Sequence, residues 1–300
     1  MNTRPQFTST GTGLLVRAPA KINLSLLIAG KRPDGYHEVE TLMAKVDVYD
    51  EIRIEPGVLP GVDLRCEGPQ WAPDGPDNLV FRAARLLLDA SGVQADIRIT
   101  LTKNVPAGSG LGSASSDAAA TLLGVARFLH LDVPGDQLMD LAGRLGSDTA
   151  FFLNGPLALC TGRGERVLPV VPSYDFLALL VLPGIHVSTA RVYAQYEHDP
   201  DLYRTAHDRI AALLSQDRLD RIARLGMNML APTCFRLECD LARLKHGMEA
   251  LGVGPMCLTG SGSALYKILG RGDEAQAREA QEKLMAHVHC PVWIVGNNRW

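Results

Sequence analysis

Residues 104–118 read Asn104-Val105-Pro106-Ala107-Gly108-Ser109-Gly110-Leu111-Gly112-Ser113-Ala114-Ser115-Ser116-Asp117-Ala118. The run before them, 95–103, alternates apolar and polar side chains with the period of a strand, and residues 118–131 are rich in Ala and Leu and are predicted to form a helix. Glycines let the backbone approach an anion closely, and the start of a helix adds partial positive charge and free N–H groups. The stretch therefore predicts a phosphate-binding loop, in which the serine hydroxyls can donate further hydrogen bonds or ligate a magnesium ion.

Better-known phosphate motifs do not match this stretch. A Walker loop carries Gly-Lys-Ser or Gly-Lys-Thr at the helix start, and no lysine lies between Asn104 and the predicted helix. A dinucleotide fingerprint needs a third glycine where Ser113 or Ala114 stands, and Asp132, the acidic residue near the required spacing, ends a predicted helix instead of a strand. A flexible Gly/Ser linker is the alternative interpretation. Leu111 and the helix that follows at once argue against it.

Composition and charge exclude several classes of partner. The chain has 300 residues, 46% of them hydrophobic, which is enough for a large core in one or two domains. A net charge of −3 gives no electrostatic basis for binding nucleic acid or an acidic membrane. Residues 1–13 are polar and lack the apolar core of a signal peptide, and no apolar run is long enough to span a bilayer. The six cysteines have no zinc-type spacing, so we expect reduced, buried thiols and a cytoplasmic protein.

The pattern along the chain is that of an irregular α+β protein. Before residue 171 it predicts strands over most of 13–64, a helix at 78–90, the strand, loop and helix described above, a helix at 135–145, a loop at 146–150 that leads into an apolar strand, and strands at 156–161 and 166–170. A boundary with proline and serine follows at 171–175. Beyond it the pattern predicts a buried strand at 176–182, helices near 188–197, 204–214, 217–230 and 240–251, a strand-turn-strand unit at 256–269, a helix at 273–288 and a strand at 292–296. We expect two domains, 1–172 and 173–300.

Two further segments carry side chains suited to chemistry. Lys21 and Asn23 are two positions apart in a predicted strand, so their side chains share one face, opposite Ile22 and Leu24. That face either lines a cleft or meets solvent, and the pattern does not decide between the two. Asp148 lies in the short loop after the 135–145 helix. It is either a turn or helix-capping residue or a general base beside the phosphate site.

Three segments, in this order along the chain, resemble the motifs of the GHMP kinases, named for galactokinase and the homoserine, mevalonate and phosphomevalonate kinases. They are Pro19-Ala20-Lys21-Ile22-Asn23, residues 106–118 and Leu258-Thr259-Gly260-Ser261-Gly262-Ser263. The segments Gly30-Lys31-Arg32-Pro33-Asp34-Gly35-Tyr36-His37, Asp77-Asn78-Leu79 and Gly146-Ser147-Asp148 are similar to those of one branch of this superfamily. The resemblance covers nearly the whole chain, and the ordered combination is far more specific than any single motif.

The resemblance implies a fold and a reaction. The implied fold is a two-domain GHMP-kinase-like α+β fold, with a mixed sheet, the phosphate loop and ATP in the N-terminal domain, and an antiparallel sheet with helices in the C-terminal domain. The implied reaction is ATP-dependent phosphorylation of the 2-hydroxyl of a cytidine-diphosphate-linked methylerythritol, a step in the non-mevalonate route to isoprenoid precursors. ATP and Mg²⁺ would be the cofactors. The protein ligands of Mg²⁺ and the oligomeric state stay open.

The resemblance also implies roles for individual residues. Asp148 would be the general base, with Lys21 beside it to stabilise negative charge. The residues implied to bind ATP are Asn78, Pro106, Ala107, Gly108, Ser109, Gly110, Leu111, Gly112, Ser113, Ala114, Ser115 and Ser116. The residues implied to bind substrate are Asn23, Tyr36, His37, Thr189, Tyr193, Gly260 and Gly262, with Tyr36 and Tyr193 on the two faces of the cytosine. Local alternatives are a helix cap for Asn78 and half-buried packing for the aromatic side chains.

The chain departs from the family pattern at two places. Ser113 and Ala114 stand where glycine is usual, and Thr149-Ala150 follow Asp148 where Val-Pro is usual. Without the proline we expect a less rigid turn at Asp148. A GHMP kinase for homoserine or a mevalonate derivative would keep Lys21, the loop and Asp148 but would have no use for a cytosine site. A non-catalytic nucleotide-binding protein is the second alternative.

Overall fold

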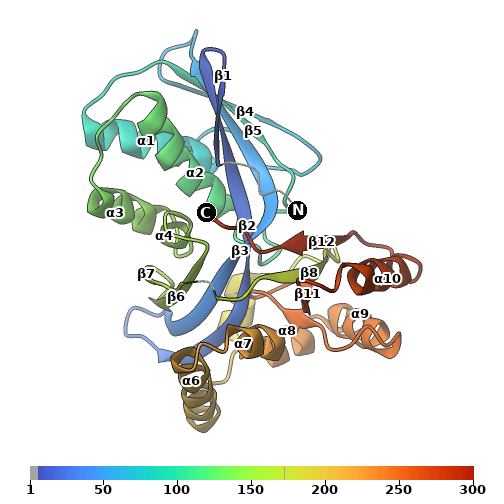
Figure 1. Ribbon diagram of the computed structural model, residues 1–300. Helices are drawn as coiled ribbons and strands as arrows, with labels where there is room; N and C mark the ends of the chain where they lie inside the picture. Colours follow the sequence, from blue (N-terminus) through green and yellow to red (C-terminus); the bar gives the residue numbers. More distant parts are fainter. Residues whose placement is uncertain (1–5, 172) are drawn as a thin grey trace.

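Two long antiparallel strands run through the molecule and connect its two halves (Figure 1). The computed structural model describes residues 6–171 and 173–300. Strand β2 spans Gly13–Lys31 and β3 spans His37–Pro56, and both are largely buried. Their register shifts at three places, one of them between Asn23 and Ser25, and it sets Lys21 directly opposite Lys45. Partners directly opposite each other in a ladder point to the same face of the sheet, so both lysines point to one side.

The first sheet is built around this pair. The strands that complete its N-terminal part are β1 (Phe7–Thr10), β5 (Ile97–Thr102), β4 (Val62–Glu67), β6 (Leu157–Gly162) and β7 (Arg166–Pro169). Their order is β1-β2-β3-β5-β4, with β6 paired to another part of β3 and β7 paired to β6. Strands β4 and β5 are parallel and the others of this group pair antiparallel, so the sheet is mixed, as predicted. The short helix η1 (Gly75–Asp77) precedes α1 (Leu79–Ser91), and α2 (Ser113–Phe128) and α3 (Gly135–Leu145) pack with α1 over an apolar core.

The second sheet is smaller and wholly antiparallel. Its order is β10-β11-β8-β12, formed by β10 (Cys257–Leu258), β11 (Leu265–Gly270), β8 (Phe176–Val181) and β12 (Val292–Gly296). The helices of this half are α5 (Thr189–Ala194), α6 (Pro200–Ser215), α7 (Leu219–Leu225), α8 (Ala231–Leu237), α9 (Cys239–Ala250) and α10 (Glu274–Met285). The predicted α+β class, with a mixed sheet first and an antiparallel sheet second, is confirmed. No helix among the described residues has the length and apolar character needed to cross a membrane.

Three local predictions are wrong, each for a visible reason. Helix α2 begins at Ser113 instead of 118, because Gly112 adopts a left-handed conformation and serves as its N-cap, so the serines belong to the first turn. The 146–150 loop and the strand after it are replaced by the one-turn helix α4 (Thr149–Phe152), whose buried phenylalanines pack as a helical turn. The predicted 217–230 helix ends at Gly226, which is also left-handed. The chain then forms strand β9 (Met227–Asn228), parallel to β2.

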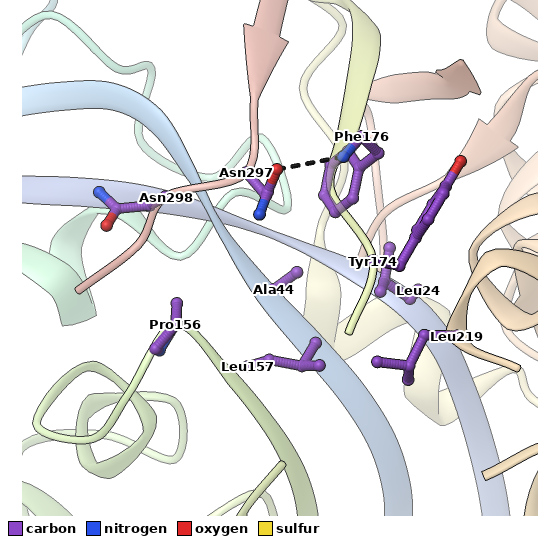
Figure 2. A pocket seen from close by; sticks show the side chains of 9 residues that line it. All are labelled: Leu24, Ala44, Pro156, Leu157, Tyr174, Phe176, Leu219, Asn297 and Asn298. Carbon is purple, nitrogen blue, oxygen red and sulfur yellow. Dashed lines mark hydrogen bonds between the residues drawn. The ribbon is translucent and has the colours of Figure 1, made fainter. Parts of the chain in front are cut away.

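The two halves share structure across the predicted boundary. Strand β9 belongs to the first sheet although it lies in the C-terminal part of the chain, and Asn297 forms a bridge with Val46 of β3. Pro172, the last residue of the first predicted domain, lies outside the described residues. The apolar seam between the halves holds a cavity of about 10 Å³, about the room of one water molecule (Figure 2). It is too small for a substrate, and the division at 172/173 stays a prediction.

Candidate active site

Lys21 and Asn23 point into the protein, so the solvent-facing interpretation is wrong. Each is 3% exposed. The Lys21 ammonium donates to Asn23 Oδ1 at 2.7 Å, and the backbone N–H of Lys21 donates to the carbonyl of Leu111 at 3.0 Å. Strand β2 thus holds the phosphate loop through its own backbone at the position of the lysine. Gly112 makes room for this arrangement, because a side chain there would lie 3.0 Å from Lys21 Cε.

The Gly-rich loop is pressed against a second Gly-rich turn from the far end of the chain. Gly108, Gly110 and Gly112 all have positive φ, at 70°, 84° and 68°. A Cβ on Gly110 would lie 2.3 Å from the carbonyl oxygen of Thr259, and one on Gly260 would lie 3.1 Å from the Cα of Gly110. Glycine is required at these points because two backbones touch. At Gly108 the space is open, since a Cβ would meet no described atom within 4 Å.

Asn23 connects its own motif, residues 19–23, to the Gly-rich turn at 258–263. Its amide oxygen accepts hydrogen bonds from Lys21, from the hydroxyl of Thr259 at 3.1 Å and from the N–H of Gly260 at 2.9 Å. Its amide nitrogen donates to Thr41 Oγ1 at 2.8 Å, and its carbonyl accepts from the Tyr266 hydroxyl at 2.7 Å. In this state Asn23 acts as a linking residue. Its expected contact with substrate stays a prediction.

Asp148 lies beside Lys21 at the start of α4. Its Oδ2 is 3.4 Å from Lys21 Nζ, and its side chain is 32% exposed while that of Lys21 is 4% exposed. The residue occupies the N-cap position of α4, but its carboxylate makes no capping hydrogen bond within the described chain. The carboxylate is therefore open to solvent on one side and held by a cation on the other. We call Lys21, Asn23 and Asp148 the lysine–aspartate centre.

The buried Cys160 and the partly buried Tyr193 lie close enough to this centre for its charge to shift their pKa values. Burial, with a smaller effect of the Asp148 charge that Lys21 partly offsets, raises the pKa of the Cys160 thiol to about 12. Burial and the charge of Asp148 raise the pKa of the Tyr193 phenol well above its usual range. Cys160 therefore stays a neutral, unreactive thiol, and Tyr193 stays a neutral phenol near the carboxylate. All six cysteines are free thiols, but the prediction that they are buried is wrong for most of them: only Cys160 and Cys234 are buried, and Cys239 is exposed.

The residues expected to bind a base form a second group near the surface. The ring of His37 lies 5.3 Å from that of Tyr193, centroid to centroid, and the ring of Tyr36, which is 54% exposed, lies 5.0 Å from the guanidinium of Arg163. Partial burial, then the charges of Lys31 and His198, lower the pKa of His37. A neutral imidazole both donates and accepts, which suits a base edge. We call Tyr36, His37, Arg163 and Tyr193 the aromatic patch.

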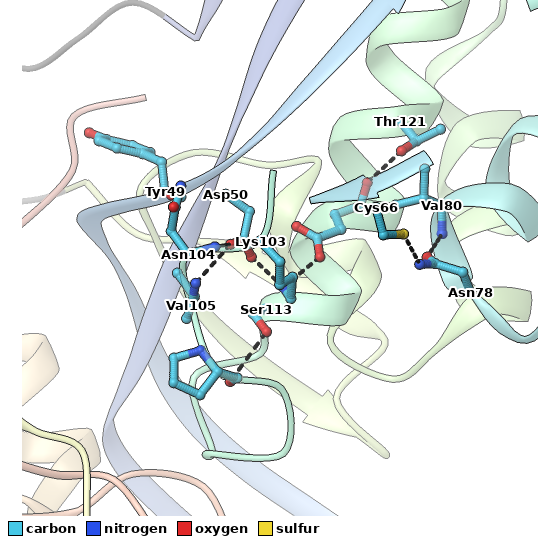
Figure 3. Close-up of polar contacts among 12 residues, drawn as sticks. Tyr49, Asp50, Cys66, Asn78, Val80, Lys103, Asn104, Val105, Ser113 and Thr121 are labelled. Atoms are coloured by element: carbon cyan, nitrogen blue, oxygen red, sulfur yellow. Dashed lines mark hydrogen bonds and ion pairs between the residues drawn. The ribbon is translucent and has the colours of Figure 1, made fainter. Parts of the chain in front are cut away.

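Asn78 has the local role that the sequence left open. Its side chain accepts from the N–H of Val80 at 2.9 Å as the N-cap of α1 (Figure 3). It also donates to the carbonyl of Pro73 at 2.8 Å. Thr189 of α5 shares a 2.7 Å hydrogen bond with Ser261, which brings that helix to the turn containing Gly260 and Gly262. The roles of Asn78 at adenine and of Thr189 at substrate stay predictions.

A buried charge cluster below the phosphate loop was missed from the sequence. The ammonium of Lys103 binds Asp50 and, at 2.7 Å, Asp117 of α2 (Figure 3). Asp50 Oδ1 also accepts the N–H groups of Asn104 and Val105, at 2.6 and 2.8 Å, so the cluster fixes the first residues of the loop. Burial raises the pKa of Asp117 well above its usual range, while the two carboxylates raise that of Lys103 despite its burial. A signal existed in the sequence: 97, 99 and 101 point inward, and 103 continues that face.

The site offers hydroxyl groups, and not a ready-made metal cluster. Among the described residues there is no group of three or more His, Cys, Asp or Glu side chains suited to a metal ion. Ser116 Oγ and Thr149 Oγ1 are buried with no hydrogen-bond partner in the described chain. Mg²⁺ in kinases needs only one or two protein oxygens besides phosphates and water, so these hydroxyls are compatible with a nucleotide-bound ion.

Comparisons with known proteins agree with the geometry. The family model of the GHMP kinases N terminal domain matches residues 78–156. A 4-diphosphocytidyl-2-C-methyl-D-erythritol kinase from Geobacter sp. (strain M21) is 39% identical over 273 residues, 90% of this chain and 94% of that protein; one from Geobacillus sp. (strain WCH70) is 35% identical over 263 residues, 88% and 90%.

Solved structures give the same result at two levels of similarity. A 4-(cytidine 5'-diphospho)-2C-methyl-D-erythritol kinase matches with a TM-score of 0.76 and 36% identity, covering 95% of this chain and all of that one, 100%. A homoserine kinase from Cytophaga hutchinsonii has a TM-score of 0.74 and 18% identity, covering 99% and 98%. The second similarity concerns the fold alone.

Proposed function

The chain belongs to the 4-diphosphocytidyl-2-C-methyl-D-erythritol kinases, a family of GHMP kinases. We propose that it transfers the γ-phosphoryl group of ATP to the 2-hydroxyl of 4-diphosphocytidyl-2-C-methyl-D-erythritol. This reaction is a step in the non-mevalonate route to isoprenoid precursors. Relatives of this name are 35–39% identical over most of its length. The observation that carries the chemistry is the Lys21–Asp148 pair, 3.4 Å apart at the mouth of the phosphate loop.

The loop residues 106–116 would hold the ATP phosphates. The first N–H groups of a helix have no partner within the helix, and the N-cap of α2 is Gly112, which has no side chain to cover them. The helix dipole adds positive potential at the same point. The open space at Gly108 leaves the loop backbone accessible, and the cluster of Lys103, Asp50 and Asp117 fixes where the loop begins.

The proposed step is a direct transfer. The 2-hydroxyl oxygen of the substrate forms a bond to the γ-phosphorus, the bond from that phosphorus to the β,γ-bridging oxygen breaks, and ADP leaves with the electron pair. Asp148 takes the hydroxyl proton, which its exposed face allows. Lys21 stabilises negative charge on the transferring group and keeps the carboxylate in place. Asn23 holds the ammonium of Lys21 at 2.7 Å.

The aromatic patch would hold the cytosine. His37 presents a neutral ring to the base edge, and Tyr36 and Tyr193 supply ring faces. Arg163, which the sequence did not single out, lies in the turn between β6 and β7 next to Asp148: a Cβ on its neighbour Gly164 would be 3.5 Å from Asp148 Oδ1. We assign its guanidinium to the diphosphate, because the diphosphate connects the base to the reacting alcohol.

Mg²⁺ would neutralise the ATP phosphates when bound, and the hydroxyl of Ser116 is the group of this chain that we assign to it. The N-terminal half, 1–172, would carry the nucleotide, and residues 173–300 would complete the substrate site through Thr189, Tyr193, Gly260 and Gly262. A cytoplasmic location is part of the proposal and would be tested by cell fractionation.

The test is ADP release with the cytidyl substrate, with homoserine and with mevalonate, at equal ATP and Mg²⁺. We expect turnover with the cytidyl substrate alone, and competitive inhibition by cytidine diphosphate. Turnover of homoserine or mevalonate without binding of cytidine diphosphate would contradict the substrate and leave only a GHMP kinase of another specificity. Asp148→Asn protein prepared in the same way controls for contaminating kinases.

A further inference from the structure

Lys45 is a buried lysine that the proposed reaction does not use. It lies on β3 directly opposite Lys21 and is 1% exposed. Its ammonium donates to two backbone carbonyls, those of Asn154 at 2.6 Å and Phe152 at 3.2 Å, and lies 6.0 Å from the centre of the Phe151 ring. No described carboxylate lies within ion-pair distance of it. Lys45 therefore gives its hydrogen bonds to a backbone segment instead of a counter-ion.

That segment is the C-terminal end of α4, the helix that starts at Asp148. A helix of four residues has no stability of its own, and its last carbonyls have no partner within the helix. Asn154 supplies one cap, because its amide nitrogen donates to the carbonyl of Ala150 at 2.8 Å. Lys45 supplies the other, because its Nζ donates to the carbonyls of Phe152 and Asn154 at the end of this turn. The two caps leave α4 little freedom to tilt or unwind.

We propose that Lys45 is a positioning residue for phosphoryl transfer, which holds α4 and so fixes the Asp148 carboxylate against Lys21. The inference rests on the proposed function, because it gives Asp148 a task in the reaction. Lys21 of β2 contacts Asp148 at the start of α4. Lys45, directly opposite Lys21 on β3, binds the backbone carbonyls at the end of α4. Two lysines that face each other on neighbouring strands therefore contact the two ends of the short helix that begins at Asp148.

The burial of a lysine without a counter-ion supports a functional reason for it. Burial lowers the pKa of Lys45 to about 7, which means that the folded protein holds this charge at a cost. An apolar side chain of similar volume would fill the same space among Phe151 and its neighbours without that cost. What it would not do is bind the carbonyls of Phe152 and Asn154.

The test compares Lys45→Met with Lys267→Met. Lys267 of β11 also donates to a backbone carbonyl, that of Val253, but it lies in the second sheet and has no contact with α4. For Lys45→Met we expect kcat to fall about tenfold or more, since small misplacements of a catalytic group are costly, with KM for both substrates within about threefold. For Lys267→Met we expect wild-type kcat. Amide hydrogen exchange in the peptide 146–155 should be faster only in Lys45→Met.

Two further variants keep the test decisive. In an Asp148→Asn background, Lys45→Met should lower the residual rate less than twofold, because the residue that it positions is already inactive. Lys45→Arg, which keeps a cation with several donors, should retain most of the wild-type kcat. Lys45→Leu, which has no donor, replaces Lys45→Met if the latter folds poorly. Unchanged kcat in the folded variant, or an equal loss with and without Asp148, would overturn the proposal. Inactive wild-type protein would instead count against the proposed function, and the exchange rates would still test the role of Lys45 at α4.

Discussion

The lysine–aspartate centre and the aromatic patch are neighbours that are built in opposite ways. In the first, Lys21 and Asn23 are 3% exposed, and the amide oxygen of Asn23 alone accepts hydrogen bonds from three donors. In the second, Tyr36 is 54% exposed, and the guanidinium of Arg163 lies 5.0 Å from its ring. Transfer chemistry is thus fixed by interior hydrogen bonds, and substrate choice rests on rings at the surface. Changes in the first region should cost turnover, and changes in the second should cost affinity.

The largest effect is expected at the carboxylate. Asp148→Asn keeps the shape of the side chain but removes the group that accepts the hydroxyl proton, so kcat should fall about 10²- to 10⁴-fold while ATP binding persists. Single-turnover transfer from labelled ATP measures the first quantity and nucleotide titration the second. A rate within a few-fold of wild type at saturating substrates would remove Asp148 as the base.

The second effect belongs to the aromatic patch. Replacing Tyr36 or Tyr193 by Ala should remove about 1–3 kcal/mol of stacking, which raises KM for the cytidyl substrate about 5- to 150-fold with little change in kcat or in ATP affinity. The matched Phe variants keep the ring face and should stay close to wild type. An equal rise in KM in the Ala and Phe variants would mean that the hydroxyls bind the substrate and the rings do not. A fall in kcat with unchanged KM would mean that the aromatic patch acts in the transfer step and not in substrate binding.

A third effect follows from the charge that the interior region carries. Lys45 has a folded-state pKa of about 7, below its ordinary value, so between about pH 7 and 10 the unfolded chain binds more protons and this group makes stability rise with pH. The slope is at most about 1.4 kcal/mol per pH unit. Urea unfolding measures the free energy of unfolding of wild type and of Lys45→Met across this range. We expect Lys45→Met to be the more stable at pH 7 and the difference between the two free energies to narrow as pH rises. If the free energy of unfolding of the two proteins changes with pH in the same way, the lowered pKa of Lys45 is wrong.

The smallest effect is expected at the loop glycine with open space around it. Gly108→Ala needs a left-handed backbone for alanine but meets no described atom, so it should cost about 1–2 kcal/mol in stability and weaken ATP binding modestly. Gly110→Val, which the loop pattern alone suggests as a clean test of phosphate binding, must also displace the carbonyl of Thr259. It should lose more stability than nucleotide affinity. Similar unfolding midpoints for the two variants would contradict the contact between the loops.

Local signals were sufficient where neighbouring residues decide the structure. The alternation of 97, 99 and 101 predicted β5, and the glycines predicted the loop, because strand period and positive φ are properties of short segments. The start of α2 was placed late because a glycine N-cap is less distinctive in a sequence than Ser or Asp. The order of three motifs identified the GHMP fold, which the comparisons confirm.

Long-range contacts explain what the sequence did not reveal. The pattern of Lys21 and Asn23 could not separate a cleft from solvent, because their burial comes from the turn at Thr259 and from α4. Lys45 gave no local signal, since its partners are 107 and 109 positions away. The absence of proline after Asp148 predicts a less rigid turn, and that stays a prediction. The hydrogen bonds that Lys45 and Asn154 donate to the backbone of this segment were not visible in the sequence.

The hydrogen bond between Asn23 and Thr259 spans 236 positions of the chain, so the two ends of the chain must fold together before this part of the site exists. Contacts of such long sequence separation form late, because a long segment must be brought back before any interaction compensates for the lost freedom. A nascent chain that has not yet reached the 257–264 turn can build strands and helices without a finished centre. On refolding from urea, kinase activity is therefore expected to return after the helical circular dichroism signal, and simultaneous recovery would contradict this order. The enzyme therefore becomes active only after the C-terminal part of the chain has been made and has folded back onto β2.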